Sequence, residues 1–214
     1  MGIQTDQTFR ILPKKLISLT LHFLDGVFTV FISLRISPNV LTIFALAAGI
    51  TAGILFVIEQ PFWAGISIII SGLFDIIDGK VAATTNRKSL FGAIFDSTLD
   101  RYSEFFIYFG LAYHFRNHWA LWVTFFALLG SNMVSYTRAR AEGLGIECTV
   151  GIMQRAERMA LLFSAAILGP IFKIFNPVMI IALVIIAVLS NLTAIQRNFF
   201  VKKVENQRKL GKEA

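Results

Sequence analysis

Six long apolar segments constrain the fold of this chain more than any other feature. They cover residues 40–58, 63–85, 90–115, 117–140, 156–175 and 177–200. As a helix, each is long enough to cross a hydrocarbon layer of about 30 Å. Only 15% of the 214 residues are charged, against about 25% in an average soluble domain. We therefore predict an all-α integral membrane protein with six transmembrane helices, and exclude a soluble globule and a disordered chain.

The connections between these segments differ in charge. Three of them, at 58–62, 115–118 and 172–177, carry only Arg116 and Lys173 as basic residues. The N-terminal stretch, the turn at 86–89, the 138–158 connection and the C-terminal tail carry most of the others. By the positive-inside rule, these basic segments and both termini should lie in the cytoplasm.

Residues 16–34 are apolar enough to raise the alternative of a seventh span. Asp25 and Gly26 lie in the middle of this stretch, and an unpaired carboxylate inside a membrane is costly. We therefore expect an N-terminal amphipathic surface helix. The predicted organisation is a cytoplasmic juxtamembrane segment at 1–35, a six-helix domain at 36–200 and a basic cytoplasmic tail at 201–214.

The second and third apolar segments contain four aspartates in a stretch of 26 residues. Acids are rare inside membrane spans and are commonly functional there. Asp75 and Asp78 are three residues apart and share one helix face, and Asp96 and Asp100 are four apart and share another. The short polar turn at 84–89 makes the two helices antiparallel neighbours. Both pairs should therefore meet near the cytoplasmic ends of their helices.

Four carboxylates that converge in a low dielectric repel one another unless cations neutralise them. Oxygen ligands without His or Cys suit Mg²⁺, Mn²⁺ or Ca²⁺, and two such ions are the arrangement that clamps a phosphoryl group in displacement. The alternative is a structural set of ion pairs, for which the sequence offers Lys80, Arg87 and Arg101.

The segment from Asp75 to Asp100 resembles the signature of the CDP-alcohol phosphotransferases, D-x2-D-G-x2-A-R-x8-G-x3-D-x3-D. Every spacing is kept at seven positions: Asp75, Asp78, Gly79, Ala82, Gly92, Asp96 and Asp100. One position departs, because Ala83 stands where the family has arginine. The resemblance implies that an acceptor hydroxyl attacks the β-phosphorus of a CDP-linked lipid and that CMP leaves. It also implies a homodimer.

The same resemblance implies residue roles. Two divalent ions, Mg²⁺ or Mn²⁺, would be held by Asp75, Asp78, Asp96 and Asp100. Asp100 would also act as general base, which is sensible for a carboxylate beside a metal-bound phosphate. Contacts to a CDP-diacylglycerol donor are implied for Asn39, Thr42, Asp78, Gly79, Ala82 and Ser89.

A second group of candidate residues consists of one serine and four arginines that border the last three apolar segments: Ser135, Arg138, Arg155, Arg158 and Arg197. Arginines from separate helices can grip a phosphate bidentately, although anchoring to lipid headgroups is an alternative. The pattern S-Y-x-[KR]-A-R-A-E, followed by R-x-E-R, is similar to the phosphatidylinositol phosphate synthase and archaetidylinositol phosphate synthase branch. That branch uses an inositol phosphate as acceptor.

We therefore expect a phospholipid-biosynthesis enzyme of the cell membrane, with its active site facing the cytoplasm, that acts on CDP-diacylglycerol and an anionic polyol phosphate. Glycerol 3-phosphate is the competing acceptor. A divalent-cation transporter and, because of Ala83, a catalytically silent membrane scaffold remain as other classes. Nucleic acid is not expected as a partner, since the basic residues border apolar segments and form no soluble face.

Overall fold

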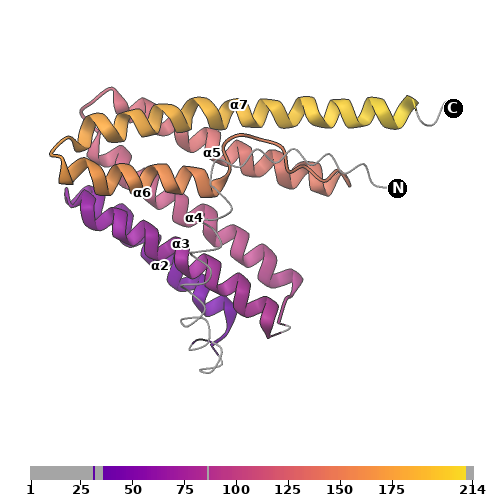
Figure 1. Ribbon diagram of the computed structural model, residues 1–214, viewed down its shortest axis with the longest axis horizontal. Helices are drawn as coiled ribbons and strands as arrows, with labels where there is room; N and C mark the ends of the chain where they lie inside the picture. The colour runs from indigo at the N-terminus through magenta and orange to yellow at the C-terminus, as the bar shows by residue number, and fades with distance from the viewer. Residues whose placement is uncertain (1–30, 32–35, 86, 211–214) are drawn as a thin grey trace.

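The computed structural model describes Phe31 and residues 36–85 and 87–210, and these residues contain six long helices and no strand (Figure 1). The helices are α2 (Pro38–Val57), α3 (Pro61–Thr84), α4 (Leu90–His114), α5 (Ala120–Gly143), α6 (Arg155–Ile171) and α7 (Phe175–Leu210). The all-helical prediction is confirmed. The predicted surface helix at 16–34 lies, apart from Phe31, outside the described residues, and so do the last four residues of the predicted tail.

Local sequence explains where the helices begin. Proline occupies the first turn of both α2 and α3, where its missing N–H costs no hydrogen bond. Ser89 caps α4, because its Oγ accepts a hydrogen bond from the backbone N–H of Gly92 at 2.9 Å. The tight connection after α6 follows Pro170 and places Lys173 at a φ of 58°.

The six helices pack as a closed ring. α2 packs against both α3 and α4, α3 packs against α6, α6 against α7, α7 against α5, and α5 against α4. The larger apolar core fills one end of this ring, where it includes Phe56, Leu111, Leu162 and Leu183. The C-terminal half of α3 and the N-terminal half of α4 lie at the other end, which leaves the aspartates apart from the main core.

Two glycines let α2 and α4 cross at very close range. A Cβ atom added to Gly110 would overlap the backbone of Gly53, and one added to Gly53 would overlap the backbone carbonyl of Phe106. Small residues at such a crossing allow backbones to approach closely in membrane proteins. The crossing fixes the register of α4, and with it the height of the aspartates, relative to α2.

Three helices within the described part of the chain are long and apolar enough to cross a membrane: Pro38–Val57, Ala120–Gly143 and Phe175–Lys209. This supports the predicted integral membrane class. α4 carries four charged residues along its first half and middle, Asp96, Asp100, Arg101 and Glu104. α6 is 17 residues long.

Candidate functional site

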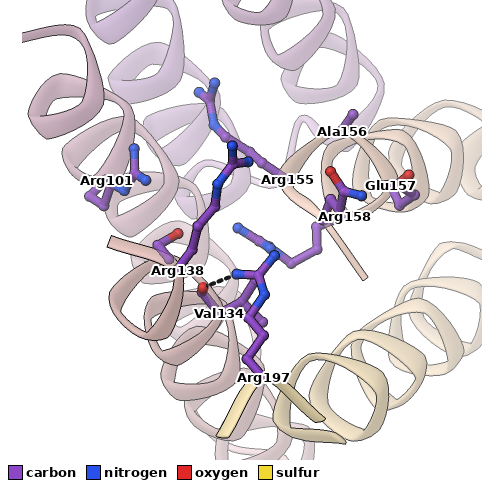
Figure 2. Close-up of a pocket in the computed structure, with 10 residues that line it drawn as sticks. Arg101, Val134, Arg138, Arg155, Ala156, Glu157, Arg158 and Arg197 are labelled. Carbon is purple, nitrogen blue, oxygen red and sulfur yellow. Dashed lines mark hydrogen bonds between the residues drawn. The ribbon is translucent and has the colours of Figure 1, made fainter. Parts of the chain in front are cut away.

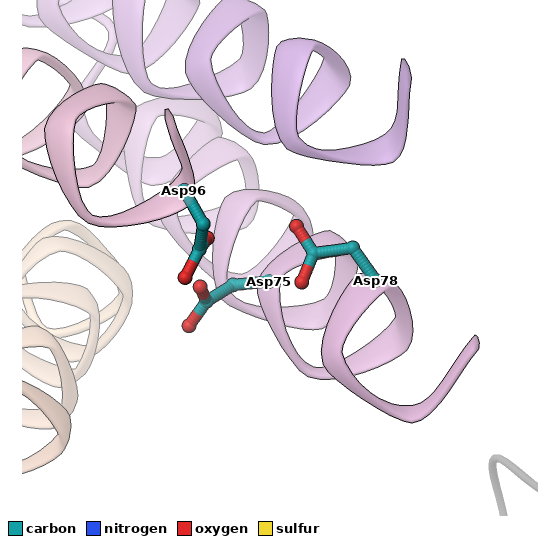
Figure 3. Close-up of side chains that lie close together, drawn as sticks. All are labelled: Asp75, Asp78 and Asp96. Atoms are coloured by element: carbon teal, nitrogen blue, oxygen red, sulfur yellow. The ribbon is translucent and has the colours of Figure 1, made fainter. Parts of the chain in front are cut away.

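Three of the predicted acids converge between α3 and α4. Asp75 and Asp78 from α3 and Asp96 from α4 each offer a carboxylate oxygen, and these oxygens lie within 4.8 Å of one another (Figure 3). The hydroxyl of Thr42 on α2 donates a hydrogen bond to Asp78 Oδ2 at 2.7 Å. Asp96 Oδ1 is buried and has no hydrogen-bond partner among the described residues. A divalent cation fits this set, because hard carboxylate oxygens with an unsatisfied member are what Mg²⁺ and Mn²⁺ bind.

The fourth acid, Asp100, is held differently. One nitrogen of Arg155, Nη1, lies 2.8 Å from Asp75 Oδ2 and 2.9 Å from Asp100 Oδ2. Arg101 Nη1 lies 3.7 Å from the same Asp100 oxygen. The ion-pair alternative was therefore partly right in naming Arg101. The closer partner, Arg155, comes from α6 and belongs to the predicted acceptor group.

The five predicted acceptor-site residues line one cavity of about 280 Å³. Its walls come from α4, α5, α6 and α7, and its lining includes Ser135, Arg138, Arg155, Arg158 and Arg197 (Figure 2). Arg101, Gln154 and Glu157 also line the cavity, and sequence reasoning did not assign them to this site. A cavity of this size suits a small polar molecule and is too small for a lipid. The five guanidinium groups that line it are suited to binding an anion.

Arg138, Arg158 and Arg197 have partners other than the aspartates. Arg138 Nε lies 2.8 Å from Glu142 Oε1 in an exposed pair. Arg158 donates from Nε to Glu104 Oε1 at 2.7 Å and from Nη2 to Glu104 Oε2 at 3.0 Å, and both side chains are buried. Arg197 instead donates to two backbone carbonyls.

Glu104 is a further residue that sequence reasoning missed. It lies four residues after Asp100 and eight after Asp96, so it continues the same acidic stripe on α4. This spacing was the available signal. The stripe links the two sites, since its first members face the carboxylate cluster and Glu104 contacts the arginine cavity.

The segment between α5 and α6 is held against α7 by hydrogen bonds next to the cavity. The backbone N–H of Met153 donates to Thr193 Oγ1 at 3.1 Å, and Arg197 Nε donates to the carbonyl of Val150 at 2.9 Å. Gly151 has a φ of 136° and packs where a side chain would meet Thr193. Cys148 is buried in this segment, and burial raises the pKa of its thiol above the ordinary value.

The residues implied for CDP-lipid binding differ in how directly they contact the carboxylate cluster. Thr42 contacts Asp78 directly, and the space beside Gly79 is open, since an added Cβ would meet no heavy atom within 4 Å. The side chain of Asn39 lies beside Gly92. Ala82 is half-buried and Ser89 is exposed, and the hydrogen bond that Ser89 accepts caps α4.

Comparison with known proteins gives a consistent result. Residues 35–195 match the CDP-alcohol phosphatidyltransferase family. An archaetidylinositol phosphate synthase of Pyrococcus horikoshii is 39% identical over 172 residues, which cover 80% of this chain and 86% of that protein. A phosphatidylinositol phosphate synthase of Mycobacteroides abscessus is 30% identical over 171 residues, covering 78% of this chain and 77% of that protein.

Solved structures agree with the sequence comparison. The Mycobacterium tuberculosis phosphatidylinositol phosphate synthase with CDP-DAG bound superimposes with a TM-score of 0.75 at 27% identity, over 82% of this chain and 92% of that one. The same enzyme in complex with manganese and citrate gives a TM-score of 0.76 at 27% identity, over 82% and 87%.

Proposed function

The chain belongs to the CDP-alcohol phosphatidyltransferase family, and from that premise we propose that it is a metal-dependent phosphatidyltransferase whose product is phosphatidylinositol phosphate. It transfers the phosphatidyl group of CDP-diacylglycerol to inositol phosphate and releases CMP. The observation that carries this proposal is the placement of a carboxylate cluster beside a cavity of arginines, with Arg155 in contact with both. A diphosphate and a phosphorylated acceptor require this pair of sites.

The donor belongs at the carboxylate cluster. Asp75, Asp78, Asp96 and Asp100 would hold two ions of Mg²⁺ or Mn²⁺, which would neutralise the diphosphate and stabilise CMP as leaving group. The remaining donor contacts are assigned to Asn39, Thr42, Gly79, Ala82 and Ser89. Thr42 also orients Asp78 through its hydrogen bond. The open space beside Gly79 gives the nucleotide room to approach.

Asp100 is assigned as general base. Its carboxylate is buried and shares Arg155 Nη1 with Asp75, so it lies between the two sites. As the acceptor oxygen bonds to the β-phosphorus, the bond from that phosphorus to the CMP oxygen breaks with its electron pair. The hydroxyl proton passes to the Asp100 carboxylate.

The acceptor's phosphate belongs in the arginine cavity, held by Ser135, Arg138, Arg155, Arg158 and Arg197. The relatives named archaetidylinositol phosphate synthase and phosphatidylinositol phosphate synthase support this assignment. Serine and choline carry no phosphate and would have little use for such a cavity. Glycerol 3-phosphate shares the phosphate, so it is the acceptor to test against inositol phosphate.

We further propose that all six helices cross the cell membrane, with both termini and the site on the cytoplasmic side. The divisions are a juxtamembrane segment at 1–35, a six-helix domain at 36–200 and a basic tail at 201–214. Asymmetry of Lys and Arg among the connections supports this orientation. A homodimer is the expected assembly, and the surrounding membrane lipids are the other expected partners.

The test uses the full-length protein in detergent with CDP-diacylglycerol and Mg²⁺. We expect CMP release to depend on added inositol phosphate, with little release on glycerol 3-phosphate, inositol or serine. Preferential turnover of glycerol 3-phosphate would reassign the acceptor. Ion flux across sealed vesicles without nucleotide, and no CMP release with any acceptor, would favour the transporter class.

A further inference from the structure

The Glu104–Arg158 ion pair is the most deeply buried charged pair in the described part of the chain. The side chains of Arg158 and Glu104 are 1% and 5% exposed, and the two nitrogens Nε and Nη2 donate to the two carboxylate oxygens. The pair joins α4 to α6 across the interior of the helix ring. A bidentate pair of this kind fixes the guanidinium in both position and rotation.

The third nitrogen of Arg158 is left for another partner. Nη1 is buried and has no hydrogen-bond partner among the described residues, and Arg158 lines the arginine cavity. A buried donor without a partner is costly. We infer that Nη1 is available to an acceptor atom in the cavity, where Arg158 lies among the other lining arginines (Figure 2).

We propose that Glu104 is a positioning residue for the acceptor site: it fixes Arg158 so that Nη1 is offered to the phosphate of a phosphorylated alcohol. This inference rests on the proposed function, since the acceptor is the molecule that enters the cavity. Glu104 also neutralises Arg158. The phosphate is therefore held by a directed hydrogen bond from this residue, and the other arginines supply the uncompensated charge. The acceptor hydroxyl is thereby kept in reach of Asp100, which lies one helical turn before Glu104.

The decisive variant is Glu104→Gln, which keeps the size of the side chain and removes its charge. Arg158 then gains an uncompensated charge and loses its fixed orientation. We expect inorganic phosphate to bind at least as tightly as in the wild type, while kcat with inositol phosphate falls at least tenfold. Glu104→Asp, which keeps the carboxylate, should recover part of kcat. Mn²⁺ affinity should stay within twofold, because Glu104 lies outside the carboxylate cluster.

The matched control is Glu142→Gln. Glu142 is likewise the carboxylate partner of a cavity arginine, Arg138, but both side chains of that pair are about half exposed. Water replaces such a partner at little cost, so kcat should change less than twofold. An equal loss of kcat in both variants would mean that net charge in the cavity matters and that fixing Arg158 does not, which would overturn the proposal.

A kcat of Glu104→Gln within twofold of the wild type would also overturn it, as would loss of phosphate binding in a folded protein. If Glu104→Gln does not fold, the double variant Glu104→Gln/Arg158→Gln removes both buried charges and is expected to fold. It should bind phosphate more weakly and turn over at least tenfold more slowly than the wild type. Near-wild-type turnover would refute the proposal. Failure of the wild type itself to use inositol phosphate would instead refute the proposed function.

Discussion

Replacing Arg155 with glutamine should tighten the binding of divalent cations. Arg155 Nη1 is shared between Asp75 Oδ2 and Asp100 Oδ2 at 2.8 and 2.9 Å. These carboxylates are the ones assigned to metal, so the guanidinium and a cation compete for the same negative charge. Glutamine keeps much of the side chain's length and removes its charge.

The size of the effect follows from those two contacts. A hydrogen bond to a charged group contributes about 1.5–3 kcal/mol. The Arg155 side chain is 24% exposed, so partial screening by solvent favours the lower figure. A free energy of about 1.4 kcal/mol corresponds to a factor of ten in affinity. Loss of one such contact in Arg155→Gln therefore predicts Mn²⁺ binding about tenfold tighter than in the wild type. Without added metal, the variant should unfold at a lower temperature than the wild type, because Asp75 and Asp100 then repel each other without a counter-ion.

Mn²⁺ binding by electron paramagnetic resonance and thermal unfolding at several Mn²⁺ concentrations measure both effects without any turnover. Arg138→Gln is the control, since Arg138 lines the same cavity but pairs with Glu142. It should tighten Mn²⁺ binding less than threefold. Unchanged or weaker Mn²⁺ binding in Arg155→Gln would show that Arg155 orients the aspartates and does not compete with the cation.

Three further predictions concern single side chains. Asp100→Asn should lower transfer at least a hundredfold while CDP-diacylglycerol still binds, measured by CMP release and by isothermal titration; turnover near the wild-type rate would remove Asp100 as base. Gly110→Ala should lower the free energy of unfolding by about 2 kcal/mol, because the new methyl group meets the backbone of Gly53. The new methyl group in Gly79→Ala meets no heavy atom within 4 Å, so this control variant should leave the unfolding temperature in detergent unchanged. The pKa of Cys148 is raised by burial, so less thiolate is present at any given pH. Alkylation of Cys148 by iodoacetamide should therefore be slow in the native protein, should increase with pH over a higher range than for a free thiol, and should become fast in denaturant. Equal alkylation rates in the native and denatured protein would contradict the burial of Cys148.

The helices could be predicted from the sequence because apolar length and start signals such as Ser37-Pro38 act locally. The bounds differ from the apolar segments by a few residues except at α7, which continues to Leu210 through the predicted tail. The residues of that extension are mostly polar and basic, and the sequence indicates that they continue the last helix into solvent, as α7 does to Leu210. The number of crossings remains a prediction, because three described helices satisfy length and apolarity together.

The site was predictable where residue spacing decides it and not where packing does. Asp75 and Asp78 share a face by their spacing alone, and the short turn after α3 brings Asp96 to them. The ion pairs of Arg155 with Asp75 and of Arg158 with Glu104 join residues 80 and 54 positions apart. Such pairs depend on how α6 sits against α3 and α4, which no local pattern encodes.

The length of α7 has a consequence for the membrane surface. A helix of 36 residues is about 54 Å long, whereas the hydrocarbon layer is about 30 Å thick. Beyond Arg197 the helix continues and carries Lys202, Lys203, Arg208 and Lys209, of which Lys209 pairs with Glu205. Arg208 donates a hydrogen bond to the carbonyl of Gly145 at 2.9 Å, which ties this part of α7 to the segment before α6. We expect this basic end of α7 to attract the headgroups of anionic lipids.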